Sequence, residues 1–83
     1  MLPESTEVVS GGAVNLTCAA DGQPTPFVSW WLDGMELTPE SSVPLGENVL
    51  QLTDVRETAT YTCVAQSEFG IIEYNADVRV IEA

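Results

Sequence analysis

Two cysteines are the side chains with the clearest chemistry in this sequence. Cys18 and Cys63 are the only thiols among 83 residues, so only one intramolecular disulfide can form. Such a bridge would close a loop of about 46 residues and stabilise the fold by about 4 kcal/mol in the chain-entropy model. The cysteine count alone leaves a second interpretation open, in which both thiols are buried and reduced in a cytosolic protein.

Carboxylates are the other reactive groups, and they do not form a recognisable catalytic set. Histidine and lysine are absent, and thirteen acidic residues face only two arginines. Paired carboxylates can hydrolyse glycosides or bind a metal only where they converge in a cleft. The close pairs here fall at expected turns and strand edges: Glu4 and Glu7, Asp33 and Glu36, Asp54 and Glu57. We therefore predict no catalytic residue, no metal site and no cofactor.

The formal net charge of −11 limits the partners of the chain. A surface of this sign repels nucleic acid, heparin-like polyanions and anionic lipid headgroups. The acidic residues are spread from Glu4 to Glu82 without a block, as on a solvated surface. The sequence therefore predicts no nucleic-acid partner, disfavours heparan sulfate, and favours a monomer.

Alternating apolar residues predict that these groups are carried by β-strands. Val14, Leu16 and Cys18 alternate with polar residues between the turn-forming segments 11–12 and 21–26. Residues 27–32 are the next expected strand. Asp33 and Gly34 are typical of a tight hairpin turn, which would lead into residues 35–37. Residues 39–46 contain two prolines, so we expect a loop there with at most a short edge strand.

The second half of the chain continues this pattern. Leu50 and Leu52 are expected to point inward, and residues 53–56 to form a corner or a single helical turn. The following strand places Tyr61, Cys63 and Ala65 inward. The last strand follows residues 67–70, with alternate residues inward: Ile72, Tyr74, Ala76, Val78 and Val80. With a broken edge strand over residues 4–9, this predicts an all-β antiparallel sandwich.

The length predicts one domain over residues 1–83. A domain of this size has a marginal core and usually needs a covalent staple. We find neither a run of ~20 apolar residues nor the basic start and apolar centre of a secretory signal. We therefore expect an excerpt of a larger ectodomain, with residues 1–3 as a linker or an expression start.

Four residues together identify the fold. Cys18, Trp30 in the next strand, and Tyr61 two residues before Cys63 have the order and spacing of an immunoglobulin domain, with a tryptophan packed on a cross-sheet disulfide. The tyrosine hydroxyl is expected to bond to the backbone near residues 55–57. The short interval between the cysteines favours the I-set type. This resemblance implies a Cys18–Cys63 bridge and an extracellular location.

Longer segments resemble the third immunoglobulin domain of the LAR-type (type IIa) receptor protein tyrosine phosphatases. They are GGAVNLTC at 11–18, QPTPFVSW at 23–30, ELT at 36–38, PLGENVLQL at 44–52 and ATYTCVA at 59–65. This resemblance implies a single-pass plasma-membrane receptor with flanking immunoglobulin and fibronectin type III domains and a cytoplasmic phosphatase activity. Members act in axon guidance and synapse organisation. Their basic proteoglycan-binding surface lies in the first domain and is not carried over.

The I-set pattern is not matched at one position. Most I-set domains pair an aspartate six residues before the second cysteine with a basic residue on a neighbouring strand. Glu57 takes the place of that aspartate, and no lysine or arginine lies between Leu37 and Gln51. The usual ion pair at the sheet edge is therefore not expected.

Two surface features are candidate sites. Asn15 begins an Asn-Leu-Thr acceptor for N-glycosylation, and strand alternation turns it outward. Trp31 should also point outward and share a sheet face with Val64 and Ile71. An exposed tryptophan beside aliphatic residues is typical of a binding hot spot. It can equally lie flat on its own sheet or against a neighbouring domain.

Two functions follow from these alternatives. In the first, the chain is an adhesion or recognition module that binds a cell-surface protein, such as a trans-synaptic adhesion protein, through the face around Trp31. In the second, it is a spacer that sets the geometry of an ectodomain and has no ligand of its own.

Overall fold

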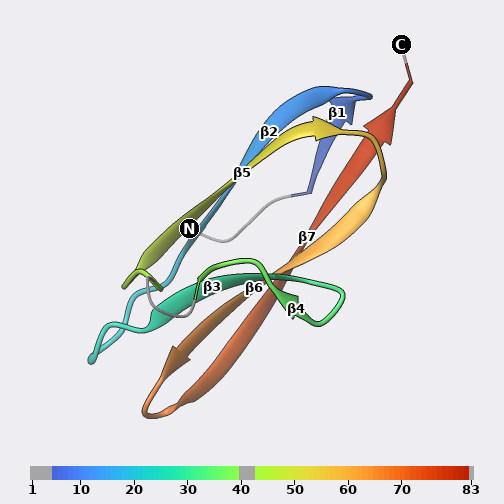
Figure 1. Ribbon diagram of the computed structural model, residues 1–83. Helices are drawn as coiled ribbons and strands as arrows, with labels where there is room; N and C mark the ends of the chain where they lie inside the picture. Colours follow the sequence, from blue (N-terminus) through green and yellow to red (C-terminus); the bar gives the residue numbers. More distant parts are fainter. Residues whose placement is uncertain (1–4, 40–42, 83) are drawn as a thin grey trace.

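The computed structural model describes residues 5–39 and 43–82, which form two packed β-sheets (Figure 1). The described residues contain no helix able to cross a membrane. The strands are β1 Thr6–Val9, β2 Gly12–Ala19, β3 Phe27–Leu32, β4 Met35–Glu36, β5 Glu47–Val55, β6 Ala59–Ser67 and β7 Gly70–Ile81.

The larger sheet has five strands in the order β1-β7-β6-β3-β4. All neighbours are antiparallel except β1, which runs parallel to β7 and pairs Thr6 with Val78. The β3–β4 hairpin turns at Asp33 and Gly34, whose φ angles of 50° and 79° are those of the predicted tight turn. The smaller sheet contains β2 and β5 in antiparallel pairing.

The core lies between the two sheets, and the predicted disulfide joins one sheet to the other. Cys18 of β2 and Cys63 of β6 are bridged, and both are fully buried together with Trp30. The rest of the buried core comes from alternate residues of the strands: Val8, Leu16, Val28, Val55, Tyr61, Ala65, Ala76 and Val78. The alternation read from the sequence therefore identified most of the core.

Asn48 connects the two sheets, and no local sequence pattern indicates this role. The Asn48 side-chain amide at the start of β5 donates to the Val28 carbonyl and to Thr38 Oγ1, both at 2.9 Å. Trp30 adds two bonds in the same region, since its indole N–H donates to the Asn48 carbonyl and its backbone N–H donates to Thr38 Oγ1, each at 3.0 Å. This network holds β3, which carries the aromatic residues of the candidate site.

The structure corrects three expectations about strands. β5 continues to Val55, so the predicted corner or helical turn at 53–56 is wrong; Asp54 stays in the strand with a φ of 51°. The first strand starts at Thr6, and residues 1–4, which include the expected linker, lie outside the described residues. Ile72 is on the inner face but is 56% exposed.

The structure also bears on two expectations about side chains. Within the described residues, no hydrogen bond joins the buried Tyr61 to the backbone at 55–57, so the predicted corner bond is absent there. The one salt bridge among these residues joins Arg56 to Asp54 at 2.9 Å, and Glu57 takes no part in it. Arg56 and Asp54 are both largely exposed, so this ion pair contributes little to stability.

Candidate protein-binding face

The candidate site is the outer face of the five-stranded sheet near the β6–β7 turn. Register places the outward side chains in rows across β3, β6 and β7. Phe27, Gln66 and Ile71 form the first row, and Ser29, Val64 and Glu73 form the second. The third row consists of Trp31, Thr62 and Asn75. We call the apolar members of these rows, Phe27, Trp31, Val64 and Ile71, the outer-face cluster.

Trp31 lies across its own strand instead of projecting into solvent. Its indole N–H donates to Ser29 Oγ at 2.9 Å. Trp31 is half-buried as a result, and Ser29 is only 8% exposed. The bond directs the indole N–H toward Ser29, and part of the ring remains accessible.

Phe27 and Leu45, which the sequence analysis did not single out, are more exposed than Trp31. Phe27 is 54% exposed and pairs with Leu45 through an isolated antiparallel bridge. Two backbone bonds hold the Leu45 segment against β3, from Val28 N–H to the Pro44 carbonyl and from Gly46 N–H to the Pro26 carbonyl. Leu45 therefore adds an exposed apolar side chain beside the outer-face cluster, from the β4–β5 connection.

A groove of about 740 Å³ runs over this part of the sheet. Phe27 and Trp31 provide aromatic walls. Acidic side chains lie at its two ends, with Glu36 opposite Trp31 on β4 and Glu68 in the β6–β7 turn. The remaining lining residues are Ser29, Val43, Gln66 and Ser67.

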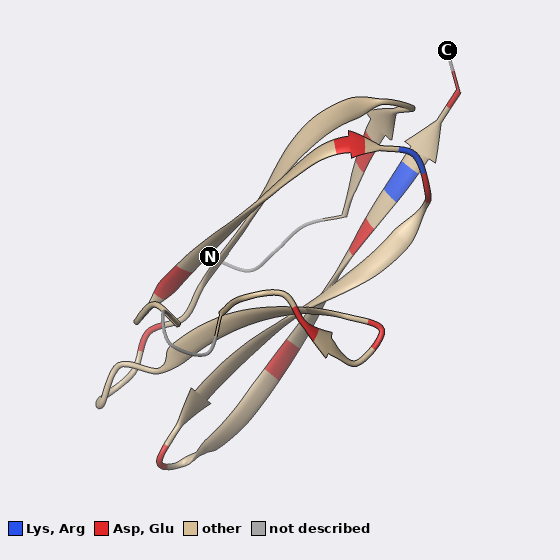
Figure 2. Ribbon diagram, viewed as in Figure 1, with Lys and Arg blue, Asp and Glu red and all other residues tan. Residues whose placement is uncertain are grey.

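The charges are distributed unevenly over the molecule (Figure 2). Both arginines lie toward the end where β7 finishes, Arg56 after β5 and Arg79 near the end of β7. Carboxylates are the only charged groups beside the outer-face cluster in the described part of the chain. The candidate face therefore combines apolar side chains with uncompensated negative charge.

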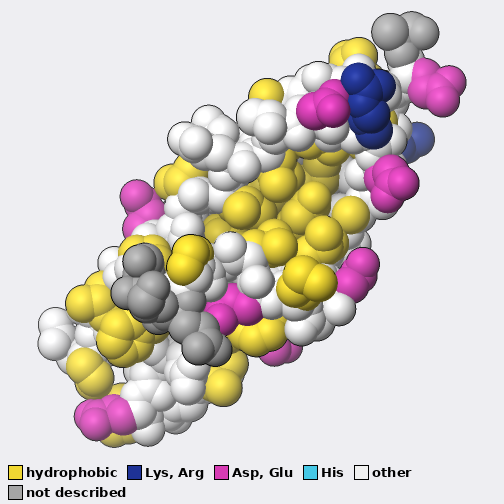
Figure 3. Space-filling view, viewed as in Figure 1, with side chains coloured by type: hydrophobic (Ala, Val, Ile, Leu, Met, Phe, Trp, Pro, Cys, Tyr) yellow, Lys and Arg dark blue, Asp and Glu magenta, His cyan; other side chains and the backbone are white. Residues whose placement is uncertain are grey.

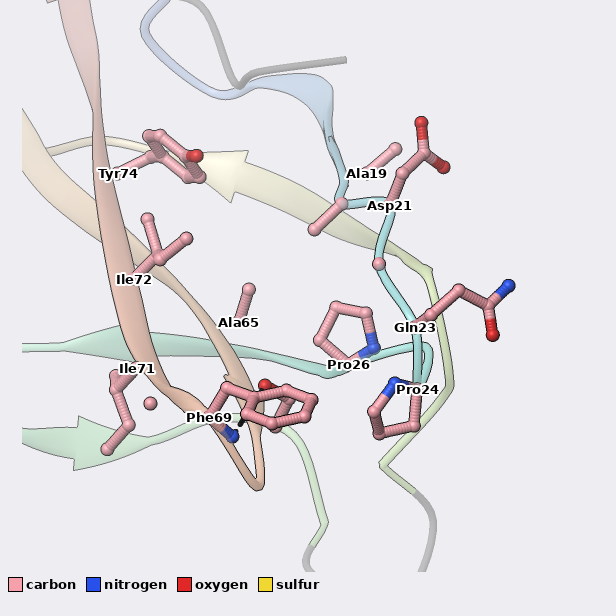
Figure 4. Close-up of a pocket in the computed structure, with 14 residues that line it drawn as sticks. Ala19, Asp21, Gln23, Pro24, Pro26, Ala65, Phe69, Ile71, Ile72 and Tyr74 are labelled. Atoms are coloured by element: carbon pink, nitrogen blue, oxygen red, sulfur yellow. Dashed lines mark hydrogen bonds between the residues drawn. The ribbon is translucent and has the colours of Figure 1, made fainter.

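A second hollow, of about 460 Å³, opens between the sheets at the same end of the molecule. Ile72 and Tyr74 line it from β7, and Pro24 and Pro26 line it from the β2–β3 loop (Figure 4). Ile72 is exposed because its inward side chain faces this opening instead of the opposite sheet. Phe69, at the β6–β7 turn, is 78% exposed beside it.

The candidate glycosylation residue lies on the other sheet. Asn15 is exposed on the outer face of β2 and pairs with Gln51 of β5. The next pairs on this face are Thr17 with Val49 and Ala19 with Glu47, so a sugar on Asn15 would project from the sheet opposite the outer-face cluster.

Apolar side chains are also visible between β5 and the larger sheet (Figure 3). Four half-buried leucines pack against the core: Leu32, Leu37, Leu50 and Leu52. No group of three possible metal ligands occurs among the described residues.

Comparisons with known proteins identify the family. The family model described as immunoglobulin domain matches residues 1–67. The chain is 51% identical over 96% of its length to chicken receptor-type tyrosine-protein phosphatase S. It is 53% identical over 94% to mouse receptor-type tyrosine-protein phosphatase F, and 46% identical over 94% to the Drosophila tyrosine-protein phosphatase Lar. It spans only 4–5% of the length of these relatives.

Solved structures agree with this assignment. The N-terminal Ig1-2 module of the Drosophila receptor phosphatase DLAR superimposes with a TM-score of 0.81 at 27% identity, covering 98% of this chain and 46% of that one. An immunoglobulin complex of titin M10 and obscurin-like 1 gives 0.80 at 30% identity, with 98% and 89% covered. The chain therefore belongs to the immunoglobulin domain family as a non-catalytic domain, and it is about half identical to the immunoglobulin region of LAR-type receptor tyrosine phosphatases.

Proposed function

We propose that this chain is an extracellular recognition module, equivalent to the third immunoglobulin domain of a LAR-type receptor phosphatase, and that it binds a protein partner at the cell surface. The parent protein would cross the plasma membrane once, carry flanking immunoglobulin and fibronectin type III domains, and hold its phosphatase activity elsewhere. Identity of about one half to receptor-type phosphatases over most of the chain supports this placement.

The observation that carries the binding role is the composition of one sheet face. Phe27 and Ile71 are 54% and 59% exposed in the first row. Val64 lies in the second row and Trp31 in the third. Large apolar side chains that gather on one face of a small acidic domain are costly to leave in water. Aromatic anchors of this kind supply most of the energy in protein interfaces. A partner in axon guidance or synapse organisation would bury this face.

A spacer role is the second candidate, and the Trp31–Ser29 hydrogen bond favours it. A tryptophan that is half-buried on its own strand needs no partner to cover it. In that case the domain would only set the distance and angle between its neighbours in the ectodomain.

Staining of cultured neurons with the tetramerised domain separates the two roles. We expect the wild-type domain to stain the cell surface and the double variant Phe27→Ala/Ile71→Ala to lose at least about ten-fold in affinity, as for removal of interface anchors. Val49→Ala, an exposed residue on the opposite sheet, is the matched control. Melting curves establish that all three proteins are folded. Equal staining by the double variant would refute the binding face and leave the spacer role.

A further inference from the structure

The ends of the outer-face groove carry negative charge that nothing in the described structure neutralises. Glu36 is half-buried in the groove wall and Glu68 is exposed at its other end. Neither carboxylate takes part in a salt bridge within the described residues. Glu73 adds a third carboxylate beside Val64, one row away from Phe27.

The two arginines of the chain are too far from the groove to neutralise its carboxylates. Arg79 is on the same sheet face as Ile71 but eight residues further along β7, which is about 26 Å at the rise of a β-strand. Arg56 is bonded to Asp54 at the far end of the sandwich. Because exposed charges are screened beyond about 8 Å at physiological salt, the groove presents its full negative charge to a partner.

From this arrangement we propose that the groove receives an arginine side chain of the protein partner. The aliphatic stem would lie against Phe27 and Trp31, and the guanidinium would bond to Glu36 or Glu68. Arginine fits better than lysine because its planar group stacks on aromatic rings and binds carboxylates with two parallel hydrogen bonds. This inference depends on the proposed function and adds the chemistry of the partner to it.

Other occupants fit less well. A second copy of this chain would bring its own net charge of −11 to an acidic face, and one of its two arginines is held by Asp54. Anionic lipids and polyanions are repelled for the same reason. A partner surface with exposed arginine beside apolar residues complements the carboxylates and the outer-face cluster together.

NMR titration of the isotope-labelled domain tests this directly. The probe is the peptide acetyl-Arg-Trp-Arg-amide at millimolar concentration, and the comparison peptide has citrulline in place of both arginines, which keeps the shape and removes the charge. We expect saturable shifts of the Trp31 indole N–H and the Ser29 amide, with the arginine peptide bound about five-fold more tightly or better, as expected for two partly exposed ion pairs.

Charge-neutralising variants locate the effect. Glu36→Gln and Glu68→Gln keep the side-chain shape. Each should lower the affinity for the arginine peptide by about two- to five-fold. Glu57→Gln, an exposed residue in the turn between β5 and β6, should change nothing. Equal affinity for both peptides, no shift at Trp31, or full binding by the Glu36→Gln/Glu68→Gln double variant would each overturn the proposal.

The peptide assay and the neuron assay can each refute one proposal without the other. If neuron staining needs Phe27 and Ile71 but the groove shows no preference for arginine, the proposed function stands and the arginine inference is refuted. If the groove prefers arginine but staining is unaffected by the apolar double variant, the binding role falls while the charge selectivity of the groove remains as a measured property.

Discussion

Removal of the Asn48 side chain should destabilise the domain far more than its half-buried position suggests. Asn48→Ala deletes two hydrogen bonds, to the Val28 carbonyl and to Thr38 Oγ1. The carbonyl of Val28 points away from β6 and would be left without its partner. A lost hydrogen bond costs about 1 kcal/mol, and an unsatisfied buried acceptor costs about 1–3 kcal/mol. We therefore expect a loss of about 2–4 kcal/mol in the free energy of unfolding.

This loss is large for a chain of this length. A domain of 83 residues has a total stability of roughly 4–12 kcal/mol. At about 4–8 °C per kcal/mol, the melting temperature should fall by roughly 8–30 °C. Urea unfolding monitored by tryptophan fluorescence and by far-ultraviolet circular dichroism measures the change.

Two further variants test whether the Asn48 amide connects the sheets. Gln51→Ala changes an exposed side chain of the same strand and should stay within about 0.5 kcal/mol of the wild type. Asn48→Asp keeps the shape but replaces the donating amide with oxygen, which the Val28 carbonyl repels, so it should be at least as damaging as alanine. If Asn48→Ala matches Gln51→Ala, or if Asn48→Asp is as stable as the wild type, the amide does not fasten the sheets.

Three more outcomes are expected. Reduction of the Cys18–Cys63 bridge, whose cysteines are 45 residues apart, should remove about 4 kcal/mol of stability, and an unchanged melting curve after complete reduction would contradict the staple argument. Expression through a eukaryotic secretory pathway should add an N-linked sugar at Asn15, seen as a mass that an N-glycanase removes and that Thr17→Ala lacks; no loss of mass from the wild type on N-glycanase treatment would mean that the acceptor is unused. Acrylamide should quench the half-buried Trp31 in Trp30→Phe and leave Trp30 protected in Trp31→Phe, because Trp30 has no exposed surface; equal quenching would contradict this packing.

The sequence predicted the features that depend on local alternation. Side chains in a strand point to opposite faces in turn, so Leu16, Cys18, Tyr61 and Cys63 could be placed inward without a structure. The Asp33–Gly34 turn was also predictable, since few residue pairs accept positive φ at both positions. The same parity placed Trp31, Val64 and Ile71 on one face. These residues belong to the candidate site whatever its function.

Only the tertiary structure determines which residues cover each face of a strand. Asn48 contacts residues 10 and 20 positions away, and no local pattern reveals such a bond. Phe27 is exposed, and Leu45 lies beside it because residues 44–46 form backbone hydrogen bonds with the start of β3 and the residue before it. Ile72 has inward parity but faces an open hollow. Parity is a property of one strand, whereas burial depends on where the opposite sheet and the connecting loops end.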